Sequence, residues 1–131
     1  MRIVAGTARG RTLAAPKSDD VIRPTADRVR ETIFNVLGQT CDGLNVLDLY
    51  AGTGALGLEA VSRGATKAVL VDKGNEALEL CRQNTAALKF EARVEIVRGD
   101  ALTTISRRVD QFQLVFADPP YAQKVGLEIL K

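Results

Sequence analysis

The sequence predicts an α/β fold with a doubly wound, mostly parallel sheet, preceded by an N-terminal β-hairpin and a helix. From Leu44 onward, four short apolar strands alternate with helical segments, which is the pattern of a parallel sheet covered by helices. The turn that follows the first of these strands is rich in glycine and opens a helix. The length of 131 residues is that of a single domain.

The N-terminal part, residues 1–40, is predicted to contain a hairpin over residues 2–13 and a helix that begins near Thr25. Residues 41–131 form the α/β core. Its strands are expected at Leu44–Tyr50, Ala68–Asp72, Arg93–Val97 and Gln113–Ala117. Its helices are expected from the glycine-rich turn to about Arg63, over Glu76–Leu88 and briefly after Asp100. Residues 126–131 have the pattern of a helix beginning, so we expect the C-terminal strands of the usual set to be missing.

The composition excludes several classes of chemistry. The chain has no histidine, which removes Ser-His-Asp and Cys-His nucleophilic catalysis and most zinc sites. Its cysteines, Cys41 and Cys81, form no CxxC pair, and Cys81 falls on the apolar face of a predicted helix, as a buried thiol does. No apolar run has the length of a membrane span, and no secretion signal is evident. We expect a cytoplasmic monomer that binds no metal.

Basic residues concentrate near the N-terminus. Residues 1–40 hold seven Lys/Arg against four Asp/Glu, whereas residues 41–131 hold eleven against twelve. This asymmetry indicates an anionic partner at one end of the molecule, although a solvated surface would show the same excess. Arg28 and Arg30 are expected to lie off the apolar stripe of the first helix. The candidate nucleic-acid contacts are Arg9, Arg11, Arg23, Arg28 and Arg30.

The glycine-rich turn, Asp48–Gly57, places Gly52, Gly54 and Gly57 in GxGxxG spacing. Glycines allow a tight turn and let a ligand approach the backbone. Asp72 ends the next strand, twenty residues after Gly52, where its carboxylate can accept hydrogen bonds from both hydroxyls of a ribose. These features predict a site for an adenosine-containing ligand, without separating NAD from S-adenosylmethionine. A turn required only for packing is the alternative.

Two further carboxylates favour S-adenosylmethionine. Asp48 lies in the turn region, where it would repel a pyrophosphate but attract a sulfonium donor that carries an ammonium group. Asp100 ends the third strand, where it can accept a hydrogen bond from an adenine amino group. Each could instead cap a strand end, but ligands bind at this edge of parallel sheets. The expected cofactor site consists of Asp48, Tyr50, Ala51, Gly52, Gly54, Asp72, Lys73, Asp100, Ala101 and Asp118.

The fourth strand runs into Asp118-Pro119-Pro120-Tyr121. The two prolines rigidify the turn and hold nearby carbonyls outward, since neither can donate a backbone N–H. A carboxylate and a carbonyl can accept both hydrogens of a planar amino group, and the tyrosine ring can stack on a nucleobase. We predict that these four residues are catalytic. A turn that only ended the strand would need neither the acid nor the aromatic.

The motif at residues 118–121, together with the turn at 48–57, resembles amino-methyltransferases that carry an (Asn/Asp/Ser)-Pro-Pro-(Tyr/Phe) sequence. Segments near the N-terminus further resemble the bacterial 16S ribosomal RNA guanine-N2 methyltransferase family, whose members act on the small subunit. The resemblance to this family extends over essentially the whole chain. Those segments are Arg2-Ile-Val-Ala-Gly, Arg23-Pro24-Thr25, Arg28-Val29-Arg30-Glu31 and Phe34-Asn35. The resemblance implies a Rossmann-like class I methyltransferase fold. It also implies S-adenosylmethionine as the cofactor and 16S ribosomal RNA as the substrate, naked or in a small-subunit particle.

Other functions share part of this pattern. Enzymes that methylate adenine N6 or a protein glutamine carry the same four-residue motif. A nicotinamide-dependent reductase shares the glycine turn and Asp72, but a Tyr-x-x-x-Lys pair fails because Val125 lies four residues after Tyr121. A non-catalytic RNA-binding module would need neither three carboxylates at strand ends nor Asp118.

Overall fold

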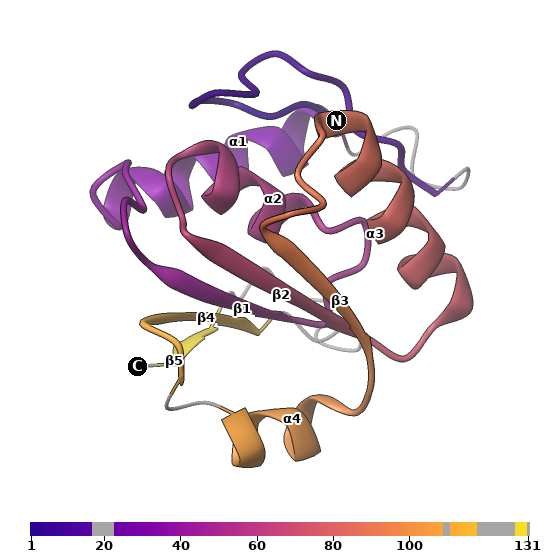
Figure 1. The fold of residues 1–131 in the computed structure, drawn as a ribbon. Coiled ribbons are helices and arrows are strands. Elements are labelled where there is room, and N and C mark those ends of the chain that lie inside the picture. The colour runs from indigo at the N-terminus through magenta and orange to yellow at the C-terminus, as the bar shows by residue number, and fades with distance from the viewer. Residues whose placement is uncertain (17–22, 109–110, 118–127, 131) are drawn as a thin grey trace.

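The computed structural model describes residues 1–16, 23–108, 111–117 and 128–130 (Figure 1). Its helices are α1 (Arg23–Val36), α2 (Ala55–Ser62), α3 (Asn75–Leu88) and α4 (Ala101–Arg108). Its strands are β1 (Asn45–Leu49), β2 (Lys67–Asp72), β3 (Val94–Arg98), β4 (Leu114–Ala117) and β5 (Glu128–Leu130). The alternation of strand and helix that the sequence predicts is confirmed, with boundaries that differ by one or two residues.

The five strands form one sheet in the order β3-β2-β1-β4-β5. The first four are parallel, and β1 is paired on one side with β2 and on the other with β4. The chain therefore builds outward from β1 to β3 and then returns to the other side of β1. Ligands of such sheets bind outside the carboxyl ends of the strands at the point where the order reverses, which lies here between β1 and β4.

The end of the chain differs from the prediction. Residues 126–131 have the pattern of a helix beginning, but Glu128–Leu130 form β5, which is antiparallel to β4. The predicted helix is wrong because a short apolar run does not distinguish the two structures. In the fold, pairing with β5 gives partners to the backbone groups along one edge of β4, which would otherwise lack them.

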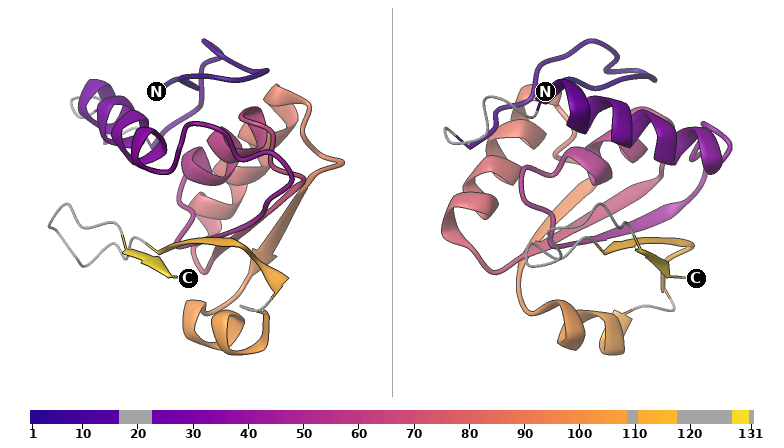
Figure 2. Two further views of the ribbon diagram at one scale, coloured as in Figure 1. Left: turned by 90° about the vertical axis from the view of Figure 1, so that its left-hand side faces the viewer. Right: turned by 180° about the vertical axis from the view of Figure 1, so that it is seen from behind.

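Helices cover both faces of the sheet. Figures 1 and 2 show α1, α2 and α3 on one face and α4 on the other. Successive side chains of a strand point to opposite faces, so each strand contributes to both layers of the core. Val46, Leu70 and Phe116 pack beneath the three helices, whereas Leu47 and Val69 belong to the layer beneath α4. The apolar runs of β1, β2 and β4 are buried on both faces, as parallel sheets require, whereas Val94, Ile96 and Val97 of the edge strand β3 are half-buried.

The N-terminal segment, residues 1–16, follows the course of the predicted hairpin. It contains an antiparallel bridge between Arg2 and Thr12, and a hydrogen bond of 3.0 Å from the Ile3 amide to the Arg11 carbonyl. The pairing is an isolated bridge without longer strands. Ile3 and Leu13 are buried in the same layer as the three helices, so the segment is packed onto the core.

Candidate cofactor site and its supports

The turn between β1 and α2 has an unusual backbone. Tyr50, Gly52 and Gly54 all have positive φ angles, of 58°, 60° and 84°. Glycine adopts this conformation at no steric cost, whereas a tyrosine in it is strained, as residues at functional turns often are. A Cβ atom on Gly52 would meet no atom within 4 Å, so the described residues leave space beside this glycine.

Asp48 holds the first turn of α2. Its Oδ2 accepts a hydrogen bond of 3.0 Å from the Gly57 amide, and the residue is 2% exposed. Helix α2 approaches β2 closely at Gly57, because a Cβ atom on this residue would lie 2.3 Å from a methyl carbon of Leu70. Gly57 therefore provides the helix–strand packing that the third glycine of this spacing usually provides. Asp48, which was expected in the turn region, lies within β1, and it has an anchoring function that the sequence did not indicate.

Asp72 connects the glycine turn to the loop after β2. Its Oδ2 accepts from the Gly52 amide at 3.0 Å, and its Oδ1 accepts from the Gly74 amide at 2.9 Å. A carboxylate offers about four lone-pair sites, so each oxygen retains capacity for one further donor. The carboxylate is half-buried at the end of β2. These properties fit the predicted role, in which Asp72 accepts hydrogen bonds from two ribose hydroxyls.

Asp100 and Ala101 lie where β3 leads into α4. Asp100 is exposed, and its Oδ2 accepts from the Thr103 amide at 3.1 Å and from the Thr103 hydroxyl at 3.3 Å. It therefore caps the N-terminus of α4, whereas the alternative interpretation from the sequence was a cap of the strand end. Its Oδ1 has no hydrogen bond in the described part of the chain. Ala101 is buried in the layer beneath α4.

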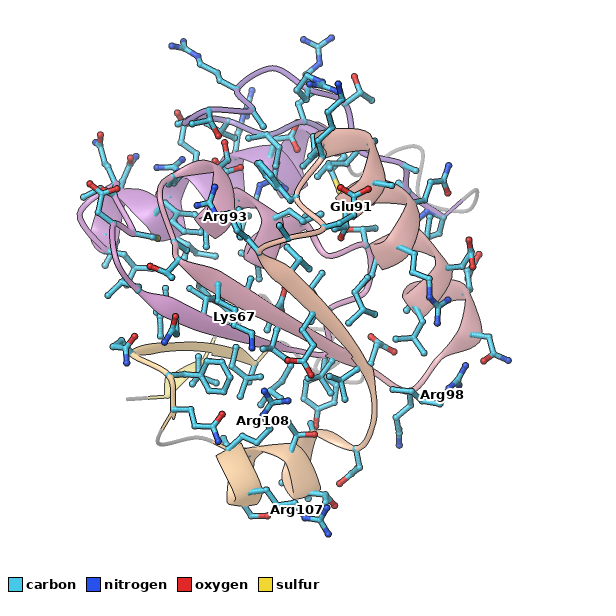
Figure 3. All side chains as sticks on the ribbon, in the orientation of Figure 1. Lys67, Glu91, Arg93, Arg98, Arg107 and Arg108 are labelled. Carbon is cyan, nitrogen blue, oxygen red and sulfur yellow. The ribbon has the colours of Figure 1, made fainter. Side chains whose placement is uncertain are left out.

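Lys73 is exposed, in the loop between β2 and α3. Its carbonyl accepts a hydrogen bond of 3.2 Å from Arg98, which also donates to the Asn75 side chain at 2.5 Å. Figure 3 shows Arg98 at the end of β3, beside this loop. Arg98 thus holds the loop that contains Gly74 and so supports one contact of Asp72. Sequence reasoning missed Arg98, because an arginine at a strand end carries no distinctive signal.

Two buried side chains of α3 lie beneath the turn. Cys81 donates from its Sγ to the Gly52 carbonyl at 3.3 Å, and Asn84 donates to the Thr53 carbonyl at 2.9 Å. Burial raises the pKa of the Cys81 thiol to about 12, and the nearby carboxylates of Asp48 and Asp72 act in the same direction. The thiol is therefore neutral and remains a donor. The sequence predicted a buried Cys81 but not these two contacts.

The strand ends meet at one edge of the sheet. Leu49, the last residue of β1, is paired with Val71 in β2 and with Ala117 in β4. The glycine turn, Asp72 and the chain that follows Ala117 therefore all leave from this edge. Asp118, Pro119, Pro120 and Tyr121 lie outside the described residues.

The candidate arginines separate into different environments. Arg9 and Arg28 are exposed. Arg11 is also exposed, but one of its Nη atoms donates to the Ala87 carbonyl of α3 at 2.7 Å. Arg23 begins α1, and its side chain lies outside the described residues.

Arg30 corrects an expectation. It was predicted to lie off the apolar stripe of its helix, but it is 3% exposed. Its guanidinium donates to Glu59 at 3.1 Å, to Asp27 at 2.9 Å and to the Arg2 carbonyl. A buried arginine is tolerated when charged and polar partners replace its water. We therefore assign Arg30 a structural function and omit it from the proposed RNA contacts.

Glu59 is the centre of this buried network and has no exposed surface. Its carboxylate accepts from Arg30, from the Arg63 Nε at 2.8 Å, and from the amides of Val4 and Ala5 at 2.9 and 3.1 Å. One carboxylate on α2 thus joins α1 and the N-terminal segment to the helix that follows the glycine turn. Both carboxylate oxygens are satisfied by two donors each.

No group of three Cys, Asp or Glu side chains in the described ranges could hold a metal ion. None of the described helices is long and apolar enough to cross a membrane.

A glycine turn at the switch point of a β3-β2-β1-β4 parallel sheet, with carboxylates at the carboxyl ends of β1 and β2, is the arrangement of class I methyltransferases. A solved structure, "Putative methyltransferase yhhF from Escherichia coli", matches with a TM-score of 0.77 and 39% identity, over 92% of this chain and 64% of that one. This chain belongs to the family described as "Conserved hypothetical protein 95", which matches residues 1–130.

Two curated relatives extend the comparison. "Ribosomal RNA small subunit methyltransferase D" of Escherichia coli strain K12 is 40% identical over 121 residues, which are 92% of this chain and 60% of that protein. "Putative rRNA methyltransferase YlbH" of Bacillus subtilis strain 168 is 38% identical over 127 residues, which are 95% of this chain and 68% of that protein. The chain thus spans about two thirds of the length of these relatives.

Proposed function

We propose that this chain transfers a methyl group from S-adenosylmethionine to the exocyclic N2 amine of a guanine in 16S ribosomal RNA. It would act as a cytoplasmic monomer on RNA that is free or in a small-subunit particle. The observation that carries the proposal is the glycine turn held between Asp48 and Asp72 at the switch point of the sheet. The names of the relatives support ribosomal RNA as the substrate.

The residues around the turn fit the cofactor. Asp72 retains acceptor capacity for the ribose hydroxyls, and the space beside Gly52 allows a ligand to approach the backbone. Asp100 would accept from the adenine amino group through its Oδ1, while its Oδ2 caps α4. When bound, S-adenosylmethionine supplies a methyl group that is activated by a positively charged sulfur. The remaining contacts are proposed for Asp48, Tyr50, Ala51, Gly54, Lys73, Ala101 and Asp118.

The motif at the end of β4 would bind the target base. The Asp118 carboxylate and the Pro119 carbonyl would accept the two hydrogens of the amine, and Tyr121 would stack on the ring. Pro120 would keep the turn rigid. Holding the amine in a reactive geometry can lower the barrier by roughly 7–11 kcal/mol in favourable systems, so orientation would supply much of the catalysis. The base must be unpaired or flipped out to reach this site.

We propose that residues 1–40 face the RNA and residues 41–131 bind the cofactor. The exposed arginines of this part, Arg9, Arg11 and Arg28, would contact RNA phosphates. Arg23 is proposed as a further RNA contact on the sequence alone.

Cofactor binding gives the first test. S-adenosylhomocysteine should raise the melting temperature of the protein, whereas NADPH should not. The Asp72→Ala variant should bind S-adenosylhomocysteine more weakly in calorimetry, because the ribose hydroxyls and the Gly52 amide lose their acceptor. Equal stabilisation by NADPH would contradict the methyltransferase assignment and favour a nicotinamide-dependent enzyme.

Substrate identity requires a separate test. With labelled S-adenosylmethionine, 16S ribosomal RNA should take up the label at guanine N2, and DNA and protein should not. Replacing both Arg9 and Arg11 with Ala should weaken RNA binding and flatten its salt dependence. Arg107→Ala is the control, since Arg107 is exposed on α4 across the sheet from the N-terminal segment (Figure 3). An unchanged salt slope in the double variant would exclude these arginines from the RNA contacts.

A further inference from the structure

Asn84 joins three parts of the chain that are distant in sequence. It lies on α3 and is 1% exposed. Its Oδ1 accepts from the Ala14 amide at 2.7 Å, and its Nδ2 donates to the Ala14 carbonyl at 3.0 Å. The same Nδ2 donates to the Thr53 carbonyl, in the middle of the glycine turn, at 2.9 Å. One buried amide therefore binds the N-terminal segment and the candidate cofactor turn at the same time.

Other contacts connect the same elements. Cys81, one helical turn before Asn84, donates to the Gly52 carbonyl, so α3 holds two successive carbonyls of the turn. The Thr53 hydroxyl lies 3.6 Å from the sulfur of Met1, and Arg11 donates to the C-terminal end of α3. The N-terminal segment is thus docked against both the turn and the helix that supports it.

These contacts make the two elements depend on each other. The carbonyls of Gly52 and Thr53 are directed at α3, which fixes the two peptide planes that follow the Gly52 amide, and that amide itself donates to Asp72. If the N-terminal segment leaves, Asn84 loses two of its three hydrogen bonds and becomes a poorly satisfied buried amide. A buried polar group without its partners is unfavourable, so the order of the turn is linked to docking of the segment.

We propose that Asn84 is a positioning residue that couples cofactor binding at the glycine turn to RNA binding at the N-terminal segment. The inference rests on the proposed function, because the segment bears Arg9 and Arg11. Each ligand would favour the docked arrangement, so each would increase the affinity of the other by the same factor. A residue that only satisfied buried groups would affect stability without this reciprocity.

Amide hydrogen exchange in the wild-type protein tests the coupling without any substitution. S-adenosylhomocysteine should slow exchange at the Ala14 amide, whose acceptor is Asn84, although the ligand would bind at the turn. If S-adenosylhomocysteine binds without slowing this exchange, the inference is wrong and the proposed function stands. If S-adenosylhomocysteine does not bind to the wild-type protein, both are wrong.

A calorimetric cycle gives the second test. The affinity for S-adenosylhomocysteine is measured with and without saturating 16S ribosomal RNA. RNA should tighten binding by about fivefold or more in the wild-type protein, and by less than twofold in Asn84→Ala. Thr85→Val is the matched control: Thr85 is buried next to Asn84, but its hydroxyl donates only to the Cys81 carbonyl within α3. Equal coupling in Asn84→Ala and the wild type, or its loss in Thr85→Val, would overturn the proposal.

Discussion

Replacing Glu59 with Ala should destabilise the protein more than any other single loss of a carboxylate in its described part. The substitution removes the acceptor of four hydrogen bonds, two from arginines and two from backbone amides. Arg30 and Arg63 would remain buried, with Arg30 reduced to Asp27 and a carbonyl, and Arg63 to the Gln39 carbonyl and the Phe34 ring. Removing one partner of a buried ion pair costs about 3–5 kcal/mol.

That loss is a large fraction of the free energy of unfolding, which is about 5–15 kcal/mol for natural domains. Urea unfolding at neutral pH, with the midpoint and slope fitted for each variant, measures it. Glu79→Ala is the matched control, because Glu79 is also a helical glutamate paired with an arginine, Arg82, but both side chains are more than half exposed. The control should change stability by about 0–1 kcal/mol. If Glu59→Ala is no more destabilised than Glu79→Ala, the buried network does not hold the N-terminal segment to the core.

Three further predictions follow from other sites. Gly57→Ala should destabilise the protein by about 1–3 kcal/mol in the same urea assay, because the new methyl would overlap the Leu70 side chain; an unchanged midpoint would mean that α2 can shift. The raised pKa of Cys81 should make native alkylation by iodoacetamide slow at pH 8. Rapid alkylation of the native protein would contradict the raised pKa. The native thiol holds its proton more tightly than the thiol of the unfolded chain, so its contribution to stability is complete below pH 9 and is lost as the pH rises toward 12. Asp118→Ala should lower turnover by about 10²-fold or more with a smaller change in cofactor affinity, and Asp118→Asn should be milder; wild-type turnover in the alanine variant would remove this residue from the mechanism.

Much of the fold could be predicted from local patterns. Strands buried on both faces are continuous apolar runs, and the glycine spacing marks the turn after β1, so the parallel sheet and this turn follow from the sequence, whereas the strand order does not. Asp72 was placed correctly at a strand end next to that turn. Its two backbone contacts were not predictable, since they depend on how the Gly52 and Gly74 amides are oriented after folding.

The features that were not predicted from the sequence share one physical cause: each depends on a partner that is distant in the chain. Arg30 is buried because Glu59, 29 residues later, neutralises it, and helical periodicity cannot identify such a partner. Asn84 has the polarity of a surface residue, yet its amide is buried among carbonyls and an amide from two other segments. The edge strand at Glu128–Leu130 likewise depends on the unpaired edge of β4.

The docked N-terminal segment has a consequence for the order in which the chain folds during synthesis. Val4 and Ala5 bind Glu59, and Ala14 binds Asn84, across sequence separations of 55, 54 and 70 residues. The ribosome makes this segment before α2 and α3, so its binding surface is absent until α3 has been made. Contacts between distant residues also slow folding, because a long loop must close before they form. We therefore expect the segment to remain open to proteases on nascent chains that end before α3, and to become protected only when Asn84 has emerged.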